Sequence, residues 1–265
     1  MNRRVKVFAT LLMALAASVQ AGADKSPPRL SDGHPDLNGV WENGAGIDFV
    51  KPVKSADGSI CVTGCVNPGG APAAPRVRIT PDRPKYKPQF QAKVDELNKR
   101  QVQFDPVLRC RSPGLPRIGP PDKIVQVPGQ FVFLYDDVSG AFFRIVPTDG
   151  RPHRADADPS TLGDSVGHWE GDTLVVEAIN FNDESWLTDD GSFHSDQLRV
   201  TERFRRVGDT IEYQAIADDP AVLAEPWKLR PRVITLKHEE LLEPTPCVEQ
   251  DLKHMVDDSH HTNPR

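Results

Sequence analysis

Short segments rich in β-branched and aromatic residues follow one another between residues 124 and 236, and turn residues separate them. Runs of this kind bounded by Gly, Pro and Asp predict strands. The expected strands are 124–127, 131–135, 141–146, 166–170, 173–181, 197–206, 210–217 and 228–236. Gly171-Asp172 and Gly208-Asp209 each stand between two such runs. Because Gly adopts the positive φ of tight hairpin turns, these pairs predict consecutive antiparallel hairpins.

A meander of this length has two unpaired edge strands that a stable protein must hide. We therefore predict an all-β, mainly antiparallel fold, with a closed or strongly curved β-barrel in residues 124–240. A two-sheet β-sandwich is the alternative. Residues 22–123 are expected to form an N-terminal arm with the first strand, a Pro-rich disulfide loop and one helix. Residues 241–265 are expected to form a C-terminal segment and a flexible tail.

The single helix is expected at residues 88–103. Pro88 suits the first turn of a helix, where a backbone N–H is not needed. Phe90, Val94 and Leu97 recur at helical spacing. The first strand is expected near Trp41.

Residues 1–21 have the layout of a secretory signal peptide. Arg3, Arg4 and Lys6 precede an uncharged apolar run, which ends in a small-residue cleavage pattern before Gly22. The run is short for a membrane span, although a retained N-terminal anchor is the alternative. The sequence therefore predicts a periplasmic or secreted protein with no membrane span in the mature chain.

The charge balance argues against nucleic acid as a partner. The full chain has a formal net charge of −6, and removal of residues 1–21 would make it more acidic. Nucleic-acid binding needs clustered Lys and Arg to contact phosphates. The basic run at residues 201–206 is short, and we expect Glu202, Arg203 and Glu212 to form solvent-facing ion pairs along strands. A small molecule is the expected partner, and the oligomeric state is not predicted.

Four cysteines lie in the predicted mature chain. An even number in an oxidising compartment favours two disulfides. Of the three connectivities, we favour a tight Cys61–Cys65 loop and a Cys110–Cys247 link from the N-terminal arm to the C-terminal segment. A four-cysteine zinc site is the alternative, but the spacing matches no common zinc pattern.

Chemically capable side chains crowd between residues 149 and 199. His153, His168 and His194 stand near strand ends, beside carboxylates such as Asp149 and Glu170. A histidine paired with a carboxylate can act as an acid or a base near neutral pH. The alternative is that these histidines satisfy local hydrogen bonds. The same histidines could hold a metal, but no two have the close spacing of a ligand pair, and no metal is predicted.

Other residues of this stretch are candidates for substrate binding. Arg151 is expected to hold a carboxylate or to stabilise an oxyanion. Trp169 and Trp186 are expected to form an apolar wall, with Ser165 and Arg199 beside it. Ser165 also fits the G-x-S-x-G pattern of a nucleophile elbow, but a predicted strand follows it where that motif needs a helix. No phosphate-binding glycine loop is present, so no nucleotide cofactor is expected.

Several long motifs resemble a family of secreted bacterial proteins of unknown function. The motifs are PDLNGVW, YKPQFQAKV, DGRPH, GDSVGHWEGDTLVVE, FND-x-x-WL, HS-x-x-LRVTERFRR and DDP…PW. They cover most of the predicted mature chain. The resemblance implies export and a shared fold, and it implies no reaction.

The leading hypothesis is a cofactor-independent enzyme that acts on a small organic substrate, aromatic or hydrophobic, as a lyase, isomerase or hydrolase. His153 or His168 would be the base, Asp149 or Glu170 would orient it, and Arg151 would be the electrostatic clamp. The first alternative is a non-catalytic barrel that carries a small hydrophobic ligand, because barrels of this size often enclose one. A second alternative is an interaction module whose Pro-rich arms dock on a partner.

Overall fold

The computed structural model describes residues 26–42, 53–54, 60–61, 83–188, 190–244 and 246–247. The predicted signal peptide lies outside these residues. Cys65 does too, and with it the predicted Cys61–Cys65 disulfide. The Cys110–Cys247 disulfide is present, with the two Cα atoms 5.5 Å apart, so this prediction is confirmed. No helix in the described part of the chain has the length and apolar character needed to cross a bilayer.

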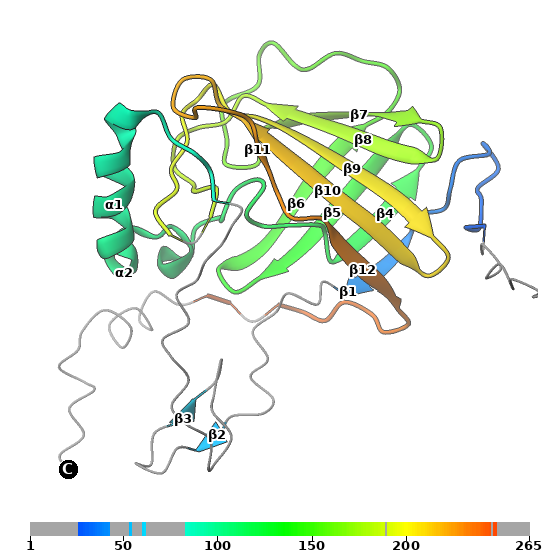
Figure 1. Cartoon of the computed structure of the whole chain (residues 1–265). Helices are drawn as coiled ribbons and strands as arrows, with labels where there is room; N and C mark the ends of the chain where they lie inside the picture. Colours follow the sequence, from blue (N-terminus) through cyan, green and yellow to red (C-terminus); the bar gives the residue numbers. More distant parts are fainter. Residues whose placement is uncertain are drawn as a thin grey trace, which may run out of the picture.

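The predicted all-β architecture is confirmed, since one large sheet dominates the structure (Figure 1). Its ten strands are β1 Gly39–Glu42, β4 Lys123–Val127, β5 Gln130–Asp137, β6 Gly140–Pro147, β7 Asp164–Glu170, β8 Thr173–Ile179, β9 Arg199–Val207, β10 Thr210–Asp218, β11 Trp227–Lys228 and β12 Arg232–Lys237. A separate ribbon pairs β2 Val53–Lys54 with β3 Ile60–Cys61. The strand expected at 228–236 is divided into β11 and β12.

The strand order explains how the sheet curls into a barrel. The order is β6-β5-β4-β1-β12-β10-β9-β8-β7, and each hydrogen-bonded neighbour runs antiparallel. Strand β1 therefore joins two meanders by pairing with both β4 and β12. Since the path has nine strands, its two end strands, β6 and β7, run parallel. They lie against each other and nearly close the barrel.

The contact between β6 and β7 is called the seam below. Within the described residues, no backbone hydrogen bond joins the two strands. Gly167 of β7 permits their close approach, because a Cβ atom there would lie 3.0 Å from both Val146 Cγ1 and Thr148 Cγ2. The barrel is therefore closed by side chains along one side.

The predicted helix is present but broken. A 3-10 turn at Pro88–Phe90 leads into α1 Gln91–Lys99, and α2 Gln101–Phe104 follows after Arg100. A second 3-10 turn spans Val107–Arg109. Figure 1 places these helices beside one end of the barrel, and the described residues that precede β1 lie at the other end.

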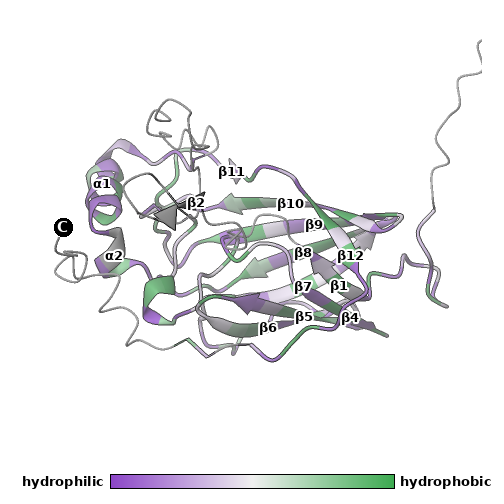
Figure 2. Cartoon of the chain, turned by 90° about the horizontal axis from the view of Figure 1, so that it is seen from below, coloured by the Kyte–Doolittle hydropathy of each residue, from purple (hydrophilic) through white to green (hydrophobic). Residues whose placement is uncertain are grey.

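Apolar side chains form two buried clusters. The first fills the barrel with inward-facing residues that include Trp41, Phe133 and Phe204. The alternation of hydrophilic and hydrophobic residues that points them inward is visible along the strands in Figure 2. The second cluster packs α1, through Val94, against the strand ends and loops at the helical end of the barrel.

Candidate functional site

The parallel seam imposes a long connection between β6 and β7. A parallel pair cannot be joined by a tight hairpin, so the chain must return along the barrel first. Residues 148–163 make this return without a helix, and we call them the crossover segment. Its two ends are fixed: Thr148 N donates to Gly129 O at 2.8 Å, and Ser160 O accepts from Asn182 N at 3.0 Å.

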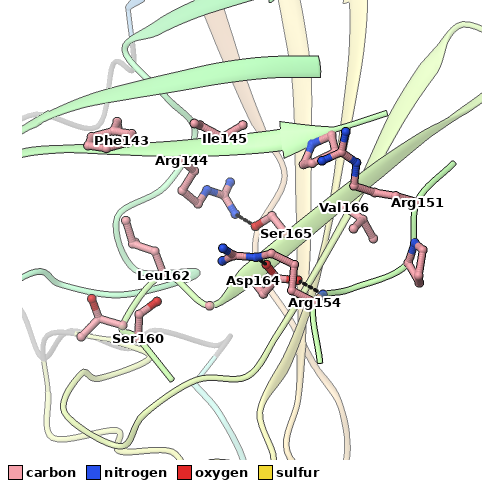
Figure 3. Close-up of a pocket in the computed structure, with 14 residues that line it drawn as sticks. Phe143, Arg144, Ile145, Arg151, Arg154, Ser160, Leu162, Asp164, Ser165 and Val166 are labelled. Atoms are coloured by element: carbon pink, nitrogen blue, oxygen red, sulfur yellow. Dashed lines mark hydrogen bonds and ion pairs between the residues drawn. The ribbon is translucent and has the colours of Figure 1, made fainter. Parts of the chain in front are cut away.

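A pocket of about 410 Å³ lies between the crossover segment and the seam (Figure 3). Its apolar lining comes from Phe143, Ile145, Pro147, Pro152, Leu162 and Val166. Its polar lining comes from Arg144, Arg151, Arg154, Ser160, Thr161, Asp164 and Ser165. This volume falls within the range of roughly 300–1,000 Å³ that is typical of small-molecule sites.

Arg144 belongs both to the pocket and to a polar network inside the barrel. Its Nη2 lies 2.5 Å from Glu202 Oε2, and the two side chains are 3% and 0% exposed. Its Nε donates to Tyr135 Oη at 3.0 Å, and its Nη1 donates to Ser165 Oγ at 3.3 Å. The other oxygen of Glu202 accepts from Tyr213 Oη at 2.9 Å. Burial opposes the charge of Arg144, but Glu202 and the two tyrosines still raise the pKa of the guanidinium, which therefore stays charged.

Glu202 corrects the expectation of a solvent-facing ion pair. Its side chain is fully buried, because it shares the inward phase of β9 with Val200 and Phe204. The expectation holds for the outward residues: Arg203 pairs with Glu170 at 2.6 Å, and Glu212 pairs with a neighbouring arginine. The buried network was therefore not predicted from the sequence, although the alternation along β9 places Glu202 on the inward side.

Arg151 stands at the rim of the pocket, paired with Asp149. Arg151 Nε lies 2.9 Å from Asp149 Oδ1, and the side chains are 57% and 39% exposed. The hydrogen bonds from Arg151 lower the pKa of Asp149 to about 2. Asp149 also accepts from the backbone N of Arg151 at 3.2 Å, so it organises the turn into the crossover segment.

Asp164 contacts both Arg154 and His153. It accepts from Arg154 Nε at 2.8 Å and from Arg154 N at 3.0 Å. Its other partner is His153, whose Nδ1 lies 3.0 Å from Asp164 Oδ2. Burial works to raise the pKa of Asp164, but the hydrogen bonds from Arg154 and His153 outweigh it and lower the pKa. His153 therefore contacts a residue of the pocket lining and is not itself part of that lining.

The other two histidines lie elsewhere. His168 is exposed on β7, with Nε2 3.4 Å from Glu170 Oε1. His194 is buried against Phe181 of the second cluster, and its Nδ1 lies 2.9 Å from Ser195 O and its Nε2 2.8 Å from Ser185 Oγ. A carbonyl only accepts, so Nδ1 carries the proton and the serine hydroxyl donates to Nε2.

The Ser185–His194 pair has the hydrogen bond of a nucleophile and its base, but it has no room for a substrate. Ser185 is fully buried. Gly114 packs directly on it, since a Cβ atom at Gly114 would lie 2.1 Å from Ser185 Oγ. Burial also lowers the pKa of His194, which keeps the imidazole neutral. We interpret the pair as a structural hydrogen bond.

The predicted substrate-binding residues are also dispersed. Trp169 stacks on His34 of the N-terminal arm, with ring centroids 4.5 Å apart, and the neighbouring Asp172 is paired with Arg29. Trp186 is buried in the second cluster, and Arg199 is exposed on β9. Ser165 does line the pocket, within the continuous strand β7, so no strand-to-helix elbow surrounds it.

The structure therefore brings together part of the predicted set. Arg151 and Ser165 line the pocket, and Asp149 and His153 adjoin it through ion pairs or hydrogen bonds with lining residues. Within the described ranges, no three His, Cys, Asp or Glu side chains gather closely enough to hold a metal ion.

Comparison with known proteins identifies no relative. No family model matches the chain, and no curated protein or solved structure matches it significantly. The resemblance to the secreted bacterial family stays a prediction.

Proposed function

We propose that this protein is an exported binding protein that holds a small organic molecule in the pocket at the seam. The observation that carries the proposal is the position of this pocket, between two parallel end strands and the crossover segment that their direction makes necessary. The Cys110–Cys247 disulfide supports an oxidising compartment. The ligand has an apolar body and a polar group, matching the two kinds of lining.

The two halves of the lining are held differently. Arg144 and Ser165 belong to strands and to the buried network, so they form a preorganised polar floor. Phe143 and Ile145 lie on β6, and Leu162 faces them across the pocket from the crossover segment (Figure 3). Phe143 is 64% exposed and Ile145 is 50% exposed, which is unusual for apolar strand residues. A bound apolar group would remove both from water, with a gain of about 25 cal/mol per Å².

The test uses N-phenyl-1-naphthylamine, a neutral dye that fluoresces in apolar surroundings. We expect a saturable fluorescence increase with the wild-type protein. The variant Leu162→Trp fills the pocket and should abolish the increase. Val233→Trp is the matched control, because Val233 is 61% exposed on β12, away from the pocket, and it should bind as the wild type does. Equal binding by the two variants would overturn the proposal.

A second candidate function is acid–base catalysis at the same pocket. The observation that favours it is the His153–Asp164 pair, since a carboxylate on Nδ1 leaves Nε2 as the base. Diethyl pyrocarbonate acylates accessible neutral imidazoles. If catalysis takes place there, the dye should protect His153 from acylation, as measured by peptide mass spectrometry. Acylation of His153 at the same rate with and without dye would exclude this role.

A further inference from the structure

We infer that the polar group of the ligand is an oxyanion, such as a carboxylate, and that Arg151 and Arg154 bind it at the rim of the pocket. The inference rests on the proposed function and deepens it. Three arginines and one aspartate line the pocket, so the lining itself carries an excess of positive charge. Each arginine already has a carboxylate partner, and the three pairs differ in how easily that partner can be exchanged.

Arg144 cannot take up the ligand by leaving its partner. Glu202 is fully buried, and its Oε2 is held by Arg144 at 2.5 Å. Breaking this pair would leave a carboxylate unpaired in the interior of the barrel, which is strongly unfavourable. Arg144 therefore stays in place as part of the floor, where its positive charge is largely balanced by Glu202.

Arg151 can exchange its partner at little cost. Asp149 is 39% exposed, so its carboxylate returns to water when Arg151 turns away. Exposed pairs of this kind contribute little to stability. A ligand whose apolar body is held in the pocket would keep its carboxylate at a high local concentration beside Arg151, which favours the exchange.

Arg154 can bind an anion without giving up Asp164. Its Nε donates to Asp164 Oδ1, while Nη1 and Nη2 make no hydrogen bond within the part of the chain that the structure describes. The side chain is 66% exposed and lies at the pocket (Figure 3). The Nε contact fixes the guanidinium, and the two terminal nitrogens remain to form the paired contacts that a carboxylate prefers. Asp164 keeps its bond from His153, so it is not left unpaired.

The neighbouring hydroxyl groups complete an anion site. Ser160 and Thr161 line the pocket on the crossover segment, next to the apolar side chain of Leu162. Hydroxyl groups donate to an oxyanion as readily as they accept from an amide. Hydroxyl donors and an apolar side chain therefore stand side by side on the crossover segment, and an amphipathic organic anion would need both.

The test compares two dyes with the same apolar body, the neutral N-phenyl-1-naphthylamine and the anionic 1-anilinonaphthalene-8-sulfonate. We expect the wild type to bind the anion more tightly. Arg151→Gln and Arg154→Gln should each weaken binding of the anionic dye about tenfold, because each removes a charged hydrogen bond, and should weaken binding of the neutral dye much less. Arg205→Gln is the matched control, an exposed arginine paired with Glu212 away from the pocket.

The variant Asp149→Asn should change the affinity for the anionic dye in the opposite direction. This variant frees Arg151 from its partner, so it should tighten the anionic dye and leave the neutral dye unaffected. If both dyes bind but respond equally to all four variants, the oxyanion inference is wrong and the proposed function stands. If neither dye binds, or if Leu162→Trp binds both as the wild type does, the proposed function itself is overturned.

Discussion

Arg144 Nη2 lies 2.5 Å from Glu202 Oε2 and joins β6, one edge of the seam, to β9 across the barrel. The pair is closed in by Tyr135 and Tyr213, which hydrogen-bond to its two ends. Because β6 has no backbone hydrogen bonds to β7, this interior contact helps to hold the edge strand in place. It therefore connects the stability of the barrel to the shape of the pocket.

Removing only Glu202 from the Arg144–Glu202 pair should lower the free energy of unfolding far more than removing both charged side chains. Glu202→Leu leaves the charge of Arg144 buried and unpaired, and we expect a loss of about 3–5 kcal/mol in the free energy of unfolding. The double variant Arg144→Met with Glu202→Leu should recover much of this loss. Glu212→Leu is the matched control, since it breaks an exposed pair and should cost less than about 1 kcal/mol. Urea denaturation followed by circular dichroism measures all three, and equal losses in Glu202→Leu and Glu212→Leu would refute the role of the buried pair.

The packing of Gly114 on Ser185 predicts a difference between two glycine substitutions. Gly114 and Gly150 both have positive φ, at 76° and 85°, so alanine is strained by backbone conformation at both. This strain costs roughly 1–2 kcal/mol. Of the two, Gly114 alone has a steric clash as well, since no atom of the described residues lies within 4 Å of a Cβ atom at Gly150. Gly114→Ala should therefore lower the melting temperature much more than Gly150→Ala. Similar melting temperatures would show that Ser185 is not enclosed as described.

Burial of His194 predicts a loss of stability in mild acid. Burial lowers its pKa from the ordinary value of 6.5, against smaller opposing effects of Ser195 O, Asp219 and Asp183. As the pH falls through 6.5, the unfolded chain takes up a proton that the folded chain does not. The free energy of unfolding therefore decreases until the folded pKa is passed, where the loss stops growing.

The variant His194→Gln isolates this contribution, because its amide can hydrogen-bond but does not titrate. Between pH 7 and pH 5, the wild type should lose more stability than the variant when both are unfolded in urea. Parallel pH profiles for the two proteins would contradict the assignment of a neutral, buried imidazole.

The fold was largely predictable because strand periodicity and Gly-Asp turns are local signals. Glu202 was predictable in principle, since Val200 and Phe204 mark its phase as inward. Arg144 was not, because its neighbours Phe143 and Ile145 are apolar although they face outward, so the alternation along β6 is hidden. The parallel seam could not be predicted from the sequence either, since it depends on β1 pairing between β4 and β12.

The predicted histidine cluster failed to form for a geometric reason. His168 follows Asp164 by four residues on one strand, and at about 3.3 Å per residue this separates the two by roughly 13 Å. His153 stays with Asp164 at the start of β7, and His168 points to solvent near the end of that strand. Proximity in sequence is a poor guide to proximity in space along an extended strand.

The most direct measurement of the central claim is a set of amide chemical shifts recorded with and without N-phenyl-1-naphthylamine. If the dye binds at the seam, the amides of residues 143–146, 151, 154 and 160–166 should shift in a saturable way. Amides of β12 around Val233, a strand in the middle of the sheet order and away from both seam strands, should stay unchanged. Shifts confined to β12, or no saturable shifts at all, would contradict a ligand site between the seam and the crossover segment.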